Sequence, residues 1–238
     1  MIRIYHTSDL HDRRHFAAPL RRLRAQHPGL YVDCGDALRG SQTVYFAREP
    51  IVAELDAAGC DVSAIGNREF HYVFAAVGAR LRPMRHPVVC ANLVDVRGRR
   101  LPFTADALVR TGAGEAVRFF GLLVPQYPAG SPWERLFGWR FLDPYAVAAE
   151  IARTTPPDVT LVALSHLGLR ADRELAQRVG RIELILGGHS HDTLRQPELV
   201  NGVPIVHAGP YGAFASRTEL ERRDGRTQIT DFALEPLA

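Results

Sequence analysis

Short apolar runs alternate with segments of helical periodicity along most of the chain. Seven runs have the length and composition of buried strands: 2–5, 30–33, 61–65, 87–91, 117–123, 159–164 and 182–186. Four segments between them repeat apolar residues at helical spacing: 16–26, 50–59, 145–155 and 173–179. Strands that alternate with helices are typical of an α/β sheet. Asp143 followed by Pro144 predicts the start of the third helix, because Asp caps a helix and Pro is accepted in its first turn.

The pattern changes after Pro204. Segments 204–208, 215–225 and 227–234 alternate as strands do, and Asp224-Gly225 predicts a hairpin turn between the last two. These residues therefore predict an antiparallel finish. The Gly- and Pro-containing piece from Pro125 to Pro132 is too short to separate domains and is expected to be a surface loop. We expect one domain over residues 1–238, a length that can bury a substantial core.

Composition removes several enzyme classes. All 29 basic residues are Arg, which excludes a Walker-type phosphate lysine, a Schiff-base lysine and a lysine general base. Arg grips phosphate well, although codon bias is the simpler account of its uniform use. The formal charge of +3 is too small for a dedicated nucleic-acid binder, so no nucleic-acid partner is expected. We expect the following arginines to form the solvated face of an amphipathic helix: Arg13, Arg14, Arg21, Arg22 and Arg24.

The cysteines and the N-terminus predict a cytoplasmic protein. Cys34, Cys60 and Cys90 are an odd number and lie in apolar stretches, which is typical of reduced core cysteine. The first residues contain no apolar signal region. No run approaches the roughly 18 apolar residues that span a bilayer, so no membrane association is expected.

Polar side chains collect after five of the expected strands. Ligands of open α/β sheets bind beyond the carboxyl ends of strands, so the five following loops are expected to converge. The side chains in these loops that are able to bind a metal are Asp9, His11, Asp36, Asn67, His166, His189 and His191. Asp-x-His and His-x-His spacings let alternate residues point the same way. We expect one polar site at this edge of the sheet.

The donor atoms of this set indicate two metal ions. Two carboxylates, one amide oxygen and four imidazoles are too many for one tetrahedral ion, and they include no thiolate. Such a set suits two divalent ions about 3.5–4 Å apart, an arrangement that activates water and holds a phosphoryl group. Mn, Fe, Zn and Co all accept these ligands, and we expect Mn to support activity in vitro.

Five short motifs resemble those of the calcineurin-like metallophosphoesterases. In chain order they are TSDLHD at 7–12, DCGDALRG at 33–40, AIGNREF at 64–70, LSHLG at 164–168 and LGGHSH at 186–191. The flanking segments, including HAGPYGAFASRTEL at 207–220, look most like the catalytic domain of 5'-nucleotidases. The resemblance implies a four-layer αββα sandwich, in which two mixed sheets are flanked by helices.

The resemblance also divides the ligands between two ions. Asp9, His11 and His191 match the ligands of one metal, and Asn67, His166 and His189 match those of the other. Asp36 matches the bridging carboxylate.

The chain departs from this family directly after Asn67. The family usually reads Gly-Asn-His-Glu with Asp two places later, whereas this chain has Arg68 for the His and His71 for the Asp. Arg68 cannot deliver a proton at neutral pH, but it can stabilise charge on a phosphoryl group. If residues 68–71 begin a helix, His71 lies on the same face as Arg68 and acts either as general acid or as a supporting residue. Glu69 is expected to be structural.

The predicted function is that of a dinuclear metal-dependent phosphoesterase. The resemblance implies metal-hydroxide attack on phosphate monoesters or diesters, with small phosphorylated molecules, including nucleotides, as substrates. The 5'-nucleotidases carry a C-terminal domain that binds the nucleoside, and we expect this chain to lack it. Two alternatives stay open: a phosphodiesterase or cyclic-nucleotide hydrolase, and a metal-binding pseudo-enzyme that binds a phosphorylated ligand or partner with little turnover.

Overall fold

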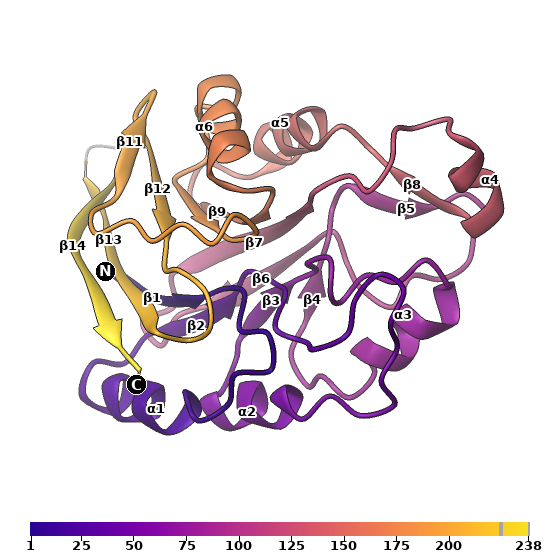
Figure 1. The fold of residues 1–238 in the computed structure, drawn as a ribbon. Helices are drawn as coiled ribbons and strands as arrows, with labels where there is room; N and C mark the ends of the chain where they lie inside the picture. The colour runs from indigo at the N-terminus through magenta and orange to yellow at the C-terminus, as the bar shows by residue number, and fades with distance from the viewer. Residues whose placement is uncertain (224–225, 238) are drawn as a thin grey trace.

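A computed structural model describes residues 1–223 and 226–237, so the turn expected at Asp224-Gly225 lies outside the described residues. Two six-stranded mixed sheets dominate the structure (Figure 1). The first has the order β14 (Arg226–Pro236), β13 (Phe214–Arg223), β1 (Ile2–Thr7), β2 (Leu30–Asp33), β3 (Val62–Ala64), β4 (Val88–Val89). The second has the order β11 (Glu198–Val200), β12 (Val203–His207), β10 (Leu184–Gly187), β9 (Thr160–His166), β7 (Ala116–Leu123), β6 (Asp106–Arg110). A small antiparallel pair joins β5 (Leu93–Asp95) to β8 (Trp139–Phe141).

Helices cover the outer faces of both sheets. Figure 1 shows α1 (Ala17–Gln26) and α2 (Ile51–Ala58) on one side of the molecule, and α5 (Pro144–Thr154) and α6 (Leu169–Arg178) on the opposite side. An apolar cluster fills the space between the sheets. A second cluster lies between one sheet and its helices, and a third lies between the other sheet and its helices. The expected four-layer αββα sandwich is confirmed. Helices α3 (Phe74–Leu81) and α4 (Pro132–Phe137) lie at the end of the molecule that carries β5 and β8.

The hydrophobic pattern located the sheet cores correctly. All seven apolar runs form strands, and the four periodic segments form α1, α2, α5 and α6. The side chain of Asp143 caps α5 by accepting hydrogen bonds from the backbone N–H groups of Tyr145 and Ala146. The pattern missed the short elements α4, β5, β6, β8 and β11, which are too brief or too exposed to show a periodicity.

The helix expected to begin at Arg68 is wrong. Residues 67–69 form a turn, and α3 begins only at Phe74. The reason is that the backbone groups of this segment have other partners: the carbonyls of Arg68 and Phe70 accept hydrogen bonds from the guanidinium of Arg80 at 2.8 and 2.7 Å. The Tyr72 N–H, which a helix would direct to the Arg68 carbonyl, donates instead to the carbonyl of Gln42 at 3.2 Å, so the helical ladder does not continue.

The structure also shows the state of the cysteines and the length of the helices. Cys34, Cys60 and Cys90 are free cysteines; Cys34 and Cys90 are buried in the core as expected, whereas Cys60 is only partly buried. Within the part of the chain that the structure describes, no helix is long and apolar enough to cross a membrane.

Candidate metal centre

The five strand ends meet at one edge of the two sheets. β1, β2 and β3 run parallel in the first sheet, and β9 and β10 run parallel in the second, so their carboxyl ends point the same way within each sheet. The loops after β1 and β2 are joined by hydrogen bonds from the N–H of Asp9 to the carbonyl of Gly35 and from the N–H of His11 to the carbonyl of Asp36. Parallel pairing thus delivers polar loops from distant parts of the chain to one place.

Asp9, His11 and His191 form the first cluster. The Nε2 atoms of the two histidines lie 3.0 Å apart. Oδ1 of the fully buried Asp9 lies 3.5 Å from Nε2 of His191 and 3.9 Å from Nε2 of His11. One potential ligand atom from each residue therefore lies within 4.8 Å of the others, which is close enough for one cation to be shared.

Asp36 and His166 form the second cluster together with Asp9. Nε2 of His166 lies 3.4 Å from Oδ1 of Asp36. Asn67 and His189 lie beside them, because Nδ2 of Asn67 is 3.5 Å from Oδ2 of Asp36 and 3.3 Å from Nδ1 of His189. The structure thus brings together all seven side chains that the sequence singled out.

The backbone at this edge adopts an uncommon conformation. Five of the seven residues have a positive φ: Asp9 (53°), His11 (49°), Asp36 (56°), His189 (75°) and His191 (59°). Few non-glycine residues occupy this region, and such residues concentrate at functional sites, where the surrounding fold holds the strain. The backbone conformation is therefore independent support for a functional role of this cluster.

The donor set fits divalent cations. Nε2 of His166 is fully buried and has no hydrogen-bond partner among the residues that the structure describes, although the ring is anchored by Nδ1, 2.7 Å from the carbonyl oxygen of Cys34. A buried imidazole nitrogen of this kind, aimed at a carboxylate, is a normal arrangement for a metal ligand whose other nitrogen is oriented by a hydrogen bond. Carboxylate, amide oxygen and imidazole together suit Mn, Fe, Zn or Co.

Strong electrostatic coupling links Asp36 to His166. Burial alone would raise the pKa of Asp36, but His166 and the backbone N–H of Arg68 lower it to about 2. Burial would lower the pKa of His166, yet the neighbouring Asp36 raises it to about 10. The pair thus favours a positive charge beside the buried carboxylate, which a bound cation would also supply.

Arg68 lies at the rim of this cluster. Its Nε is 3.9 Å from Oδ2 of Asp36, and its backbone N–H donates to Oδ1 of Asp36 at 2.7 Å. Its Nη1 donates to the carbonyl oxygens of Arg39 and Gly40 at 3.2 and 3.5 Å. The side chain remains 34% exposed, so its guanidinium is held near the candidate ligands and is still accessible to a ligand.

Two buried charged side chains organise the surrounding loops. The carboxylate of Glu69 accepts hydrogen bonds from four backbone N–H groups, those of Asp36, Ala37, Leu38 and Gly66. The structural role expected for Glu69 agrees with this geometry, although Glu69 lies in a turn and not in a first helical turn. Arg80 of α3 makes the complementary arrangement, because it donates to four backbone carbonyls, those of Ser41, Val44, Arg68 and Phe70.

His71 is placed differently from Arg68. Its Nδ1 accepts a hydrogen bond from the N–H of Val73 at 2.9 Å. Burial and the nearby Arg80 lower the pKa of His71, although a hydrogen bond to the main chain of Thr43 acts in the opposite direction. Among the described residues, no hydrogen bond or ion pair joins its ring to the seven clustered side chains. The shared helical face that was expected for Arg68 and His71 does not form, because this segment is a turn.

Sequence reasoning missed two residues beside the cluster. The ring of Tyr211 lies 5.4 Å from that of His11 and 5.5 Å from that of His191, and the Tyr211 N–H donates to the carbonyl of Asp9. Nε2 of Gln126 lies 3.4 Å from Oδ1 of Asn67. An available signal for Tyr211 was an aromatic residue between Pro210 and Gly212, in the loop that follows β12.

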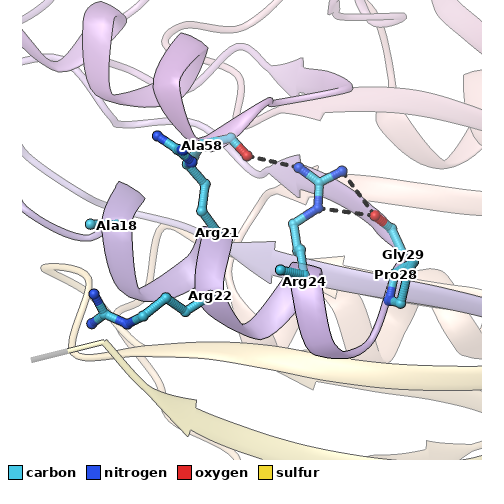
Figure 2. Close-up of a pocket in the computed structure, with 8 residues that line it drawn as sticks. Ala18, Arg21, Arg22, Arg24, Pro28, Gly29 and Ala58 are labelled. Carbon is cyan, nitrogen blue, oxygen red and sulfur yellow. Dashed lines mark hydrogen bonds between the residues drawn. The ribbon is translucent and has the colours of Figure 1, made fainter.

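The arginines near the N-terminus only partly follow the prediction. Arg21 and Arg22 lie on α1, but Arg13 and Arg14 precede the helix. A surface cavity of about 650 Å³ lies beside α1. Figure 2 shows residues that line it, among them Arg24, which donates to the carbonyls of Ala58 and Gly29. The carbonyl groups of Ala58 and Gly29 lie at the ends of backbone segments, where they need a hydrogen-bond donor. Arg24 supplies it, so the packing of the fold explains this cavity.

Comparisons with known proteins agree with the fold and the site. No family model matches the chain. It is 31% identical over 242 residues to the uncharacterized metallophosphoesterase YunD of Bacillus subtilis, covering 92% of this chain and 50% of that protein. It is 26% identical to the 5'-nucleotidase of Mus musculus, covering 90% of this chain and 41% of that protein. The 5'-nucleotidase precursor of Thermus thermophilus superposes with a TM-score of 0.81 at 26% identity, over 98% of this chain and 54% of that one.

The fold, the cluster and these similarities define the class of protein: the chain belongs to the calcineurin-like metallophosphoesterase superfamily. Within that superfamily it is similar to the 5'-nucleotidases. The chain spans about half, or less, of the length of these relatives.

Proposed function

We propose that this chain is a dinuclear metal-dependent phosphoesterase that hydrolyses phosphate monoesters or diesters, nucleotides among them. The observation that carries the proposal is the convergence of seven metal-competent side chains from five strand ends, with ligand atoms of Asp9, His11 and His191, and of Asp9, Asp36 and His166, within 4.8 Å of one another. Asp9, His11 and His191 would hold one ion and Asn67, His166 and His189 the other, with Asp36 between them. Divalent ions in this place would lower the pKa of a coordinated water and neutralise phosphoryl charge.

The chain's own residues would orient the phosphoryl group. Arg68 presents a guanidinium that is fixed by two backbone carbonyls and lies near Asp36, so it can donate two hydrogen bonds to phosphoryl oxygens. Such preorganised donors stabilise the charge that develops in the transition state. Glu69 keeps the Asp36 loop in position, and Asp9 orients the His189 backbone by accepting its N–H.

The proton for the leaving group does not come from Arg68, because a guanidinium stays charged in proteins and does not act as a general acid. We propose that His71 is not the donor either, since the N–H of Val73 occupies its Nδ1 and, among the described residues, no hydrogen bond or ion pair joins its ring to the seven clustered side chains. General acid catalysis contributes about 10²- to 10⁴-fold, so esters with good leaving groups are the preferred substrates. His71→Gln is therefore expected to leave turnover of AMP within about threefold of wild type.

Turnover by the Mn²⁺-loaded protein tests the function. The substrates are p-nitrophenyl phosphate, bis-p-nitrophenyl phosphate and AMP, and the variants are Asp36→Ala and Arg68→His. We expect hydrolysis of p-nitrophenyl phosphate by the wild type, loss of at least about 10³-fold in Asp36→Ala, and a selective gain on AMP in Arg68→His, because the new imidazole supplies a proton. Absence of turnover with two metals bound per chain would overturn the proposal.

One observation favours a second candidate, a metal-binding pseudo-enzyme. Arg68 replaces the proton donor of the family motif, while the metal-competent residues are all present. In that case the protein would bind inorganic phosphate through Arg68 without hydrolysing esters. Phosphate binding that Arg68→Ala abolishes, together with no turnover, would favour this candidate.

We also propose a cytoplasmic location. Cys34, Cys60 and Cys90 are free, and burial raises the pKa of all three thiols, which keeps them unreactive. Free thiols suit a reducing compartment. Fractionation of cells that express the tagged protein tests this, and recovery outside the cytoplasm would contradict it.

A further inference from the structure

Three consecutive apolar residues are exposed beside the candidate metal centre. Val44, Tyr45 and Phe46 are 49%, 45% and 36% exposed, and we call this segment the aromatic lip. Single exposed apolar residues are ordinary on protein surfaces, whereas three in a row, two of them aromatic, are a candidate contact surface for a ligand. The position of this segment in the fold decides what it can bind.

The loop that carries the aromatic lip is firmly held. The Ser41 N–H donates to the Val44 carbonyl at 3.0 Å, and the Val44 N–H donates to Oγ of Ser41 at 3.1 Å. The buried guanidinium of Arg80 donates to the carbonyls of Ser41 and Val44. The Arg39 guanidinium lies 4.2 Å from the centre of the Phe46 ring. The two aromatic rings are therefore carried on a fixed turn and not on a free end.

The same contacts tie this loop to the site. Arg80 bonds the carbonyl of Val44 with one nitrogen and that of Arg68 with the other, so a single side chain spans the two loops. Arg68 in turn bonds the carbonyls of Arg39 and Gly40, at the start of the lip loop. On the other side, Gln42 donates to Gln126 at 3.0 Å, and Gln126 lies against Asn67.

We propose that the aromatic lip binds a flat aromatic ring carried by the leaving group of the bound phosphoester, with a nucleobase as the ring that fits best. This inference rests on the proposed function. A phosphoryl group held by Arg68 and the candidate metal ligands leaves its ester substituent at the rim of the site, where this loop begins. Tyr and Phe rings stack on bases with little dependence on base identity. The aromatic lip would therefore favour substrates that carry an aromatic ring without distinguishing one base from another.

The test compares AMP with ribose 5-phosphate, which share the same scissile bond and differ in the base. Tyr45→Ala and Phe46→Ala are expected to raise KM for AMP about tenfold each, the factor that one lost stacking contact produces. KM for ribose 5-phosphate and kcat for both esters should stay within about twofold. Leu199→Ala, which removes an exposed apolar residue from β11, serves as the control and should change neither KM.

The outcomes separate the two proposals. Equal KM values for AMP and ribose 5-phosphate, or equal effects of the lip variants on both, would overturn the lip proposal and leave the phosphoesterase intact. If no ester is turned over, the proposed function fails, and dissociation constants at equilibrium are then compared in place of KM values. Calorimetry should then give tighter binding of AMP than of ribose 5-phosphate to the wild type, with the difference lost in Tyr45→Ala, and equal affinities would overturn the lip as well.

Discussion

Asp172 and His207 show how single buried residues support the candidate metal centre from behind. Oδ2 of Asp172 lies 2.8 Å from Nε2 of His207, and Oδ1 accepts from the hydroxyl of Ser165, the residue before His166. Gly187 lies between them, and a Cβ there would stand 2.1 Å from Nε2 of His207. The pair fills space that the glycine leaves directly under the strand ends.

Removal of Asp172 should therefore destabilise the fold. Truncation of one partner of a buried charged or hydrogen-bonded pair leaves the other without compensation and costs about 3–5 kcal/mol. We expect Asp172→Ala to lower the free energy of unfolding in urea by this amount. The neighbouring Arg173 makes an exposed ion pair with Glu198, so Arg173→Ala is the matched control and should change stability little. Equal effects of both substitutions would contradict the argument.

His6 predicts part of the acid sensitivity of the fold. Burial, assisted by the neighbouring His207, lowers its pKa from 6.5 to about 3. Between these values the unfolded chain binds a proton at this position that the folded chain does not, so stability falls as the pH decreases from 6.5 toward 3. His6→Gln should reduce this slope by up to about 1.4 kcal/mol per pH unit.

Urea unfolding at several pH values between about 7 and 4 measures that slope. His27 is exposed, so His27→Gln is the control and should leave the slope unchanged. The same slope in His6→Gln as in wild type would rule out the assigned cause.

At the scale of elements, β4 and β7 bring the two sheets into very close contact. A Cβ on Gly121 of β7 would stand 2.1 Å from the carbonyl oxygen of Val89 on β4, a backbone atom that cannot turn away. Val89 belongs to the core between the sheets, together with Phe119 of β7. The absence of a side chain at residue 121 thus sets the spacing of the two sheets at this point.

Gly121→Ala should force the sheets apart locally. Overpacking of a core costs about 1–3 kcal/mol, and we expect a destabilisation in this range. Gly78 of α3 is the matched control, because a Cβ there meets no atom of the described part of the chain within 4 Å. Gly78→Ala should be neutral or stabilise by up to about 1 kcal/mol, since Ala favours a helix. Thermal or urea unfolding of both variants tests this expectation. A Gly121→Ala variant as stable as wild type would contradict the close approach.

At the scale of the whole molecule, the candidate metal centre joins the two sheets. Asp9, Asp36 and Asn67 follow strands of the first sheet, while His166, His189 and His191 belong to the second. Ions bound between them would crosslink the sheets in the folded state only. Ligands that bind the native state alone stabilise it by mass action.

Mn²⁺ should accordingly raise the melting temperature. At about 100 times its dissociation constant, one bound ion adds about 2.7 kcal/mol, which corresponds to a shift of about 5–10 °C for a chain of this size. Chelation should reverse the shift, and Asp36→Ala should abolish most of it. Asp158 is an exposed acidic residue that is not one of the seven candidate ligands. Asp158→Ala is therefore the control and should respond as wild type does. No shift in the wild type would speak against metal binding at this centre.

Both the arrangement of the core and the candidate ligands could be predicted from local pattern. Apolar runs such as residues 159–164 must be buried wherever the chain folds, and parallel strands must present their carboxyl ends together, so the polar residues after them had to converge. The roles of the seven side chains and the single-domain organisation stay predictions. The short edge strands β6 and β11 were missed because partly exposed residues carry little periodicity.

Sequence by itself determined which segments are buried and which residues can bind a metal, because burial and donor chemistry are properties of the residues themselves. Only the tertiary structure decided what Arg68 and His71 face. Their orientation depends on Arg80 and Glu69, whose hydrogen bonds to distant backbone groups replace the expected helix with a turn. The aromatic lip likewise became visible only through contacts between loops that lie far apart in the chain, since a hydrogen bond across the fold leaves no local pattern in the sequence.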